Sequence, residues 1–263
     1  MALLHMTFTS QVLEMNVDMD VILPENTEGL IGMDGKASDT YPTLYLLHGM
    51  SDDHTIWERR TSIERYASDK NLAVVMPTTD LGWYTNMHFG PRYWDFISDE
   101  LPRVCRSFFP HMSRRREETF VAGLSMGGYG AIKCGLRASE TFGWAAGLSS
   151  GLDIAEELDG HELGSAHYWT DIFGSADMFR GSFNDLFAAV DDLAASDKPR
   201  PRLFLWCGTE DFLYAHNLRF RDYAREKGLA LTYEESHGDH SWECWDAKIQ
   251  DVLGWLPLNK EAK

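Results

Sequence analysis

A serine stands between two glycines in the segment T-F-V-A-G-L-S-M-G-G-Y-G-A, residues 119–131. The pattern is G-x-S-x-G, with Gly123, Ser125 and Gly127 at its fixed positions. An apolar run precedes the serine and a glycine- and alanine-rich run follows it, as the strand–turn–helix of a nucleophile elbow requires. A strained serine needs small neighbours two residues away on each side, and both glycines meet that need. Ser125 is therefore the predicted nucleophile.

A glycine-rich turn between a strand and a helix can also bind phosphate. That alternative fits less well, because the segment has neither the G-x-G-x-x-G spacing nor the lysine of a P-loop. The chemistry favoured by the pattern is acyl transfer.

A serine nucleophile in an elbow is followed along the chain by an acid and then by a histidine. The run R-L-F-L-W-C-G-T-E-D, residues 202–211, is typical of a late strand that ends in an acidic turn. Asp211 is the preferred acid, because the apolar Phe212 and Leu213 that follow could bury and orient it. Glu210 is the alternative.

Three histidines follow the acid. His240 lies in S-H-G-D-H-S-W-E-C-W, between an expected strand at 231–234 and an expected helix that Ser241 could cap. This junction would let His240 reach Ser125 as the general base. His237 lies nearer the strand and is its rival, whereas His216 would point away on a helix.

An oxyanion needs two N–H donors. The residue after the nucleophile, Met126, supplies one. The loop after the early strand L-Y-L-L-H-G-M supplies the other, for which we expect the N–H of Met50. His48 and Gly49 shape this turn, and the His48 side chain could tie the loop down.

Two other groups of residues are weaker candidates for a functional site. The H-G-D-H segment, residues 237–240, has no second ligand group at matching spacing, so we expect neither a metal nor a cofactor. The aromatic segment at 83–94 is either core packing or a pocket wall.

The elements that position these residues alternate between strands and helices. Alternation of apolar and polar residues over 13–23 indicates an antiparallel or edge strand. Short, continuously apolar runs predict buried parallel strands, and the stretches between them predict helices on both faces of the sheet. The strands are expected at 43–48, 72–77, 119–124, 144–149 and 202–208, and the helices at 60–71, 93–109, 126–137 and 217–227.

Residues 150–200 are rich in Gly, Asp, Phe and Ser and show no clear strand. They are expected to form a small cap or lid on a single domain spanning residues 1–263.

The composition of the chain limits the classes of partner that it could bind. The formal charge of −17 argues against nucleic acid and anionic membranes, which both require a basic surface. No run approaches a membrane span, and the first ten residues lack the features of a signal peptide. The four cysteines form no C-x-x-C pair and fit reduced thiols. A cytoplasmic protein is expected.

Six segments together resemble the putative-esterase family of α/β-hydrolases. They span about residues 44–245 and occur in the family's order: L-L-H-G-M, G-W-Y-T-N-M, Y-W-D-F-I-S-D-E-L-P, A-G-L-S-M-G-G-Y-G-A, C-G-T-E-D-F-L-Y and H-S-W-E-C-W. That family includes tributyrin (acetyl) esterases, S-formylglutathione hydrolases, feruloyl esterases and mycolyltransferases. The likeness is greatest to the tributyrin-esterase branch, because S-formylglutathione hydrolases generally carry histidine where this chain has Leu124.

The resemblance implies an α/β-hydrolase fold and a cytoplasmic serine carboxylesterase acting on short acyl esters, sometimes acetylated sugars or feruloyl esters. It places the triad on Ser125, Asp211 and His240, and sets Trp83 and Tyr84 near the acyl pocket. It also implies a homodimer or tetramer. An S-formylglutathione thioesterase, an acyltransferase and a non-catalytic relative of the fold remain alternatives.

Overall fold

The computed structural model describes residues 1–27, 29–31, 38–160 and 167–258. Within them lies one eight-stranded sheet with the order β1-β2-β4-β3-β5-β6-β7-β8. β3 to β8 are parallel, whereas β2 runs antiparallel to both β1 and β4. The strands are β1 (Ala2–Ser10), β2 (Met15–Leu23), β3 (Thr43–Leu47), β4 (Ala73–Pro77), β5 (Thr119–Leu124), β6 (Trp144–Leu148), β7 (Arg202–Gly208) and β8 (Leu231–Ser236).

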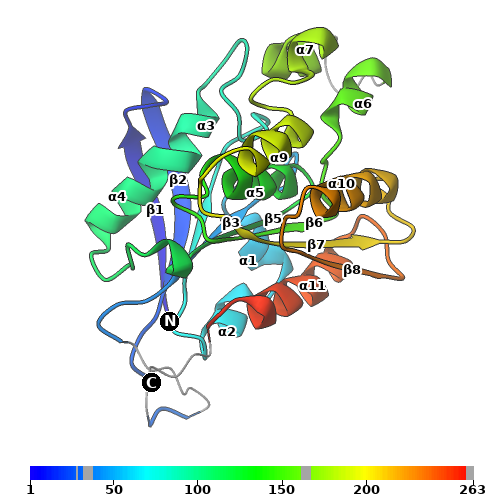
Figure 1. The fold of residues 1–263 in the computed structure, drawn as a ribbon. Coiled ribbons are helices and arrows are strands. Elements are labelled where there is room, and N and C mark those ends of the chain that lie inside the picture. Colours follow the sequence, from blue (N-terminus) through cyan, green and yellow to red (C-terminus); the bar gives the residue numbers. More distant parts are fainter. Residues whose placement is uncertain (28, 32–37, 161–166, 259–263) are drawn as a thin grey trace.

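Helices cover both faces of this sheet (Figure 1). They are α1 (Ile56–Arg60), α2 (Ile63–Ala67), α3 (Tyr93–Asp95), α4 (Leu101–Phe108), α5 (Met126–Arg137), α6 (Ile154–Gly160), α7 (Tyr168–Phe173), α8 (Ala176–Phe179), α9 (Leu186–Ala194), α10 (Tyr214–Glu226) and α11 (Trp242–Trp255). A π-helical turn, η1 (Phe96–Glu100), joins α3 to α4, and a 3₁₀ turn, η2 (Arg116–Glu118), precedes β5.

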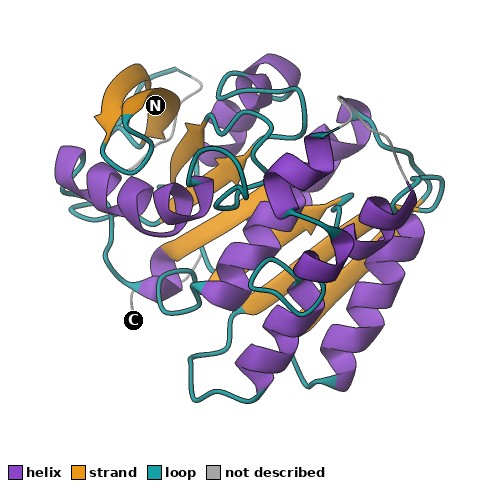
Figure 2. Cartoon of the chain, turned by 90° about the horizontal axis from the view of Figure 1, so that it is seen from above, coloured by secondary structure: helices purple, strands orange, loops and turns teal. Residues whose placement is uncertain are grey.

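Two apolar cores hold the layers together. α4, α5, α9 and α10 pack on one face, and α1, α2 and α11 pack on the other. Seen from above, helices lie over the strands (Figure 2). All five residues of β3 are buried, as continuous apolar runs in a doubly covered sheet must be. The predicted α/β-hydrolase architecture, mostly parallel with an antiparallel edge, is confirmed.

Four local expectations differ from the structure. β1 was not anticipated, and the helix expected at 60–71 is shortened to α2 (Ile63–Ala67), since α1 already ends at Arg60. Residues 150–200, which showed no clear strand and were expected to form a small cap or lid, form α6 to α9 where they are described; residues 161–166 of this segment lie outside the described residues. Ser241 occupies the cap position of α11, but its hydroxyl makes no capping hydrogen bond.

The candidate residues gather at one edge of the sheet. Ser125 follows β5, Asp211 follows β7, His240 follows β8, and Met50 lies just past β3. The carboxyl ends of parallel strands open at the same edge, which is where α/β folds place their sites. Among the described residues, no helix is both long and apolar enough to cross a bilayer.

Candidate active site

Ser125 occupies a strained turn between β5 and α5. Its backbone has φ 52° and ψ −116°, which a residue with a side chain adopts only when its surroundings enforce it. The Ser125 N–H donates a 2.9 Å hydrogen bond to the Leu148 carbonyl. A Cβ on Gly123 would lie 2.4 Å from the Gly127 carbonyl oxygen, and one on Gly127 would lie 2.5 Å from that of Leu47. The turn therefore requires both glycines of the motif.

A chain of hydrogen bonds links Ser125 to a carboxylate. The Nε2 of His240 lies 3.1 Å from Ser125 Oγ. The Nδ1 of the same ring lies 2.9 Å from Oδ2 of Asp211. These are the distances at which an imidazole can remove a hydroxyl proton while a carboxylate fixes its tautomer.

Asp211 is buried and firmly held. Its side chain has no exposed surface, and its Oδ1 accepts a 2.9 Å hydrogen bond from the Leu213 N–H. Burial alone would raise the pKa of Asp211. Hydrogen bonds with His240, Leu213 and Ser149 outweigh burial and hold the pKa below its usual range. Asp211 therefore faces His240 as an anion.

Two aromatic rings flank His240. The Phe212 ring lies 4.6 Å from the imidazole, and the Trp245 ring meets it edge-on at 4.9 Å. Phe212 itself is 72% exposed, so it does not bury Asp211 as the sequence suggested. Its ring lies against the His240 imidazole instead.

The rival residues form pairs of their own. The side chain of His237 is 92% exposed, and its Nδ1 lies 2.9 Å from Oε1 of Glu210. Glu210 also accepts the Gly238 N–H, and these contacts lower its pKa to about 2. His216, on α10, pairs with Glu156 of α6. The geometry thus brings together Ser125 and the preferred acid and histidine.

His48 lies beneath the loop that follows β3. Its side chain is buried, with Nε2 accepting the Thr79 N–H at 3.0 Å and Nδ1 lying 2.7 Å from the Gly49 carbonyl. Because the N–H and C=O of a trans peptide point in opposite directions, the Met50 N–H is turned away from His48. Met126 is the first residue of α5, and the helix dipole favours negative charge at this amino end.

The aromatic segment contributes Trp83 and Tyr84 to the core, where the two side chains form a buried aromatic wall. Trp83 is 6% exposed and Tyr84 is fully buried, with its hydroxyl donating to the His48 carbonyl at 2.9 Å. The Trp83 indole donates to the Tyr168 hydroxyl at 2.8 Å. That hydroxyl in turn contacts the Met50 sulfur at 3.2 Å.

Comparison with known proteins decides the family. Residues 10–256 match the sequence profile described as putative esterase. The chain belongs to the putative-esterase family. Membership identifies it as a carboxylic ester hydrolase.

Relatives agree over nearly the whole chain. An acetyl esterase of Caldicellulosiruptor saccharolyticus is 30% identical over 97% of this chain and 98% of its own. The substrate-bound structure of FphF, a fluorophosphonate-binding serine hydrolase of Staphylococcus aureus, is 34% identical with a TM-score of 0.87, covering 97% of this chain and 98% of that one. An S-formylglutathione hydrolase of Staphylococcus aureus, solved as the apoenzyme, has the same identity and coverages with a TM-score of 0.85.

Several residues beside this esterase site were not found from sequence. Tyr168 lies in the 150–200 segment, which offered no motif. Lys133, on α5, is fully buried, and its Nζ lies 2.8 Å from Thr85 Oγ1 and 2.7 Å from Asn184 Oδ1. Only the tertiary fold shows these contacts, because the partners are far apart in sequence.

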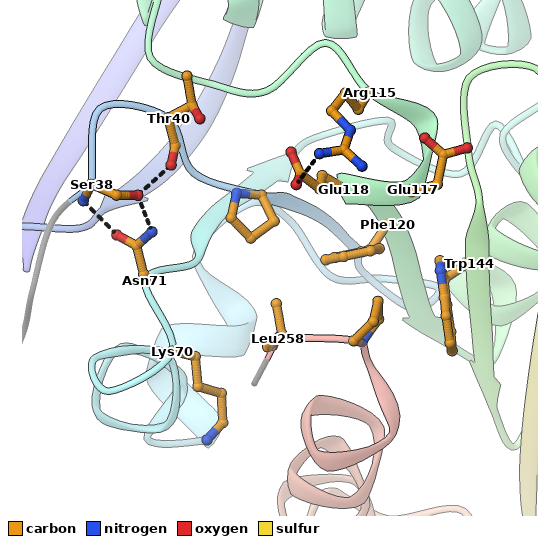
Figure 3. Close-up of a pocket in the computed structure, with 12 residues that line it drawn as sticks. Ser38, Thr40, Lys70, Asn71, Arg115, Glu117, Glu118, Phe120, Trp144 and Leu258 are labelled. Atoms are coloured by element: carbon orange, nitrogen blue, oxygen red, sulfur yellow. Dashed lines mark hydrogen bonds and ion pairs between the residues drawn. The ribbon is translucent and has the colours of Figure 1, made fainter. Parts of the chain in front are cut away.

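A cavity of about 570 Å³ lies away from the site (Figure 3). It opens at the amino ends of β5 and β6, where Phe120 and Trp144 line it beside the Arg115–Glu118 ion pair. The proposed catalytic residues follow the carboxyl ends of the parallel strands. This cavity therefore lies at the opposite edge of the sheet.

Proposed function

We propose that the enzyme is a serine carboxylesterase with Ser125 as nucleophile, His240 as general base and Asp211 as the group that orients the imidazole. The observation that carries the proposal is the hydrogen-bond chain from Ser125 Oγ through His240 to Asp211, at 3.1 and 2.9 Å. Ser125 is partly exposed, so an ester can reach it.

The reaction proceeds in two halves. Ser125 Oγ attacks the ester carbonyl while its proton moves to His240 Nε2, and the N–H groups of Met50 and Met126 receive the oxyanion. The imidazolium then gives its proton to the departing alcohol, leaving an acyl-enzyme. Water attacks that intermediate with His240 again as base, releasing the acid and restoring Ser125. No cofactor takes part in these steps.

The proposed acyl pocket is small. Trp83, Tyr168 and Met50 are connected by contacts at 2.8 and 3.2 Å, and we expect this group to narrow the approach to Ser125. Tyr168 belongs to the segment at about 150–200, which we assign as a cap. An ion pair from Arg219 to Asp153 and a contact between His216 and Glu156 fasten the start of this cap to α10. Acetyl and butyryl esters, including acetylated sugars, fit such a site better than long acyl chains.

Hydrolysis of p-nitrophenyl acetate, butyrate and octanoate tests the proposal. The wild type should prefer the two short esters, and Ser125→Ala and His240→Ala should lose turnover. His237→Ala is the matched control and should retain it. A flat chain-length profile would reject the short-chain assignment, and an active Ser125→Ala would reject the nucleophile.

A thioesterase acting on S-formylglutathione is the second candidate, and the likeness to an S-formylglutathione hydrolase favours it. The charge of −17 disfavours an anionic substrate such as a glutathione thioester. Comparing kcat/KM for S-formylglutathione and for an acetylated xylo-oligosaccharide separates the two. Product analysis with added alcohols tests for acyl transfer to acceptors other than water.

A further inference from the structure

Three potential metal ligands meet at the antiparallel edge of the sheet. His5 of β1 and Asp20 of β2 are paired residues of the same ladder, and Glu58 approaches them from α1. One donor atom from each lies within 4.8 Å of the others. In the sheet, β4 and β3 separate β2 from β5, and Ser125 follows β5 (Figure 1). The cluster is therefore separate from the esterase site.

Two carboxylate oxygens in this cluster lack hydrogen-bond partners among the described residues. Asp20 is completely buried; its Oδ1 lies 2.7 Å from His5 Nδ1, but its Oδ2 has no partner. Oε1 of Glu58 is also buried and unpartnered. Buried carboxylate oxygens are normally paired with donors or metals, because their desolvation is otherwise uncompensated.

The cluster brings together two carboxyl groups and one imidazole. A divalent cation would compensate both carboxylates and supply the missing partner to each.

We propose that His5, Asp20 and Glu58 form a binding site for a Zn²⁺ ion, with water in the fourth position. One imidazole and two carboxylates form a donor set suited to zinc, whereas Mg²⁺ and Ca²⁺ prefer six or more oxygens. Bonds of about 2.1 Å in a tetrahedral site put donor atoms about 3.4 Å apart. The His5 side chain is 69% exposed and can turn to reach that spacing.

The role of this ion is structural. It would tie the edge strand β1 to α1, the helix that follows the loop carrying Met50. Because an ion that binds only the folded chain stabilises it, zinc should raise the Tm without taking part in ester hydrolysis.

Isothermal titration calorimetry of chelator-stripped protein without a histidine tag tests the site, with ZnCl₂ and MgCl₂ as the titrants. We expect one zinc per chain, weak magnesium binding and a zinc-dependent rise in Tm. His5→Ala and Glu58→Gln should weaken zinc binding at least tenfold, while His111→Ala, which changes an exposed histidine elsewhere, should not. Circular dichroism verifies that each variant is folded.

Unchanged zinc affinity in both His5→Ala and Glu58→Gln would overturn the proposal. So would magnesium binding as tight as zinc, or a Tm that zinc does not move. Hydrolysis of p-nitrophenyl acetate by the two variants should stay at the wild-type level.

Discussion

The backbone N–H of Thr79 donates a 3.0 Å hydrogen bond to Nε2 of the buried His48. Because an amide N–H can only donate, this nitrogen must be the acceptor, and the ring proton resides on Nδ1. Nδ1–H then donates to the Gly49 carbonyl at 2.7 Å. Burial lowers the pKa of His48, which keeps the ring neutral and this arrangement in place. Thr79 thereby controls the direction of the Gly49–Met50 peptide.

His48→Ala should lower kcat more than it raises KM. Without the imidazole, the Gly49–Met50 peptide can rotate, and the Met50 N–H that we propose as an oxyanion donor is no longer held in place. Loss of one oxyanion donor costs about 100- to 1,000-fold in kcat, and partial loss of its orientation should cost about tenfold or more. Steady-state kinetics with p-nitrophenyl acetate measure both constants. Thr79→Ser, which keeps the backbone N–H, is the control. A rise in KM alone would contradict this role for His48.

On the acidic side of the pH profile, kcat/KM should depend on a single ionisation. The pKa of Asp211 lies below its usual value of about 4, so this carboxyl stays ionised above that pH. The Asp211 carboxyl therefore adds no second ionisation to the profile above about pH 4. A plot of log kcat/KM against pH should rise with a slope of one. A slope of two would mean that Asp211 titrates together with its partner.

Asp211→Asn should reduce kcat by about 10⁴-fold, because an amide does not hold the productive tautomer of His240 or stabilise its charged form. Glu210→Gln is the matched control, since Glu210 lies in the adjacent position but pairs with the exposed His237. It should change kcat by less than about threefold, as for other surface substitutions. Equal losses in the two variants would favour Glu210 as a second functional acid.

Most of the sheet could be predicted because parallel strands buried on both faces have continuous apolar sequences. β3 and β5 are such strands, and the elbow after β5 carries its own motif. β1 is different. Its half-buried residues alternate with the exposed His5, Thr7 and Thr9. This alternation does not indicate that β1 pairs with β2. Its pairing depends on the register of the folded hairpin.

The candidate site was only partly predictable, because some of its residues lie in local sequence motifs and others do not. Ser125 and the acidic turn after β7 carry local signals, whereas the roles of His48 and Lys133 depend on distant contacts. His48 meets Thr79 across 31 residues, and Lys133 meets Asn184 across 51. A lysine in a helix is normally exposed, so sequence alone gave no reason to bury Lys133.

Phe212→Ala should lower kcat about two- to tenfold while the protein remains folded. The ring covers His240 at 4.6 Å, and an aromatic contact of this kind contributes about 0.5–1.5 kcal/mol to the position of the imidazole. Phe212→Leu should retain more of the activity because it keeps apolar cover. Phe108→Ala, which removes an exposed ring from α4, is the control for loss of surface area. Full activity in Phe212→Ala would show that the ring has no part in turnover.

Lys133→Met should reduce the free energy of unfolding by about 1–3 kcal/mol, because it removes the donor shared by three acceptors, two of them on buried residues. Lys133 Nζ contacts the Thr85 hydroxyl, the Asn184 amide oxygen and, at 3.4 Å, the Tyr84 carbonyl. Tyr84 has φ 49°, a left-handed conformation that costs energy in a residue with a side chain and depends on such contacts. Kinetics should show a raised KM for p-nitrophenyl butyrate as the aromatic wall relaxes. Urea unfolding measures the stability, with the exposed Lys198→Met expected within about 0.5 kcal/mol of wild type. Equal stability of the two variants would mean that the buried amine contributes nothing to holding this wall.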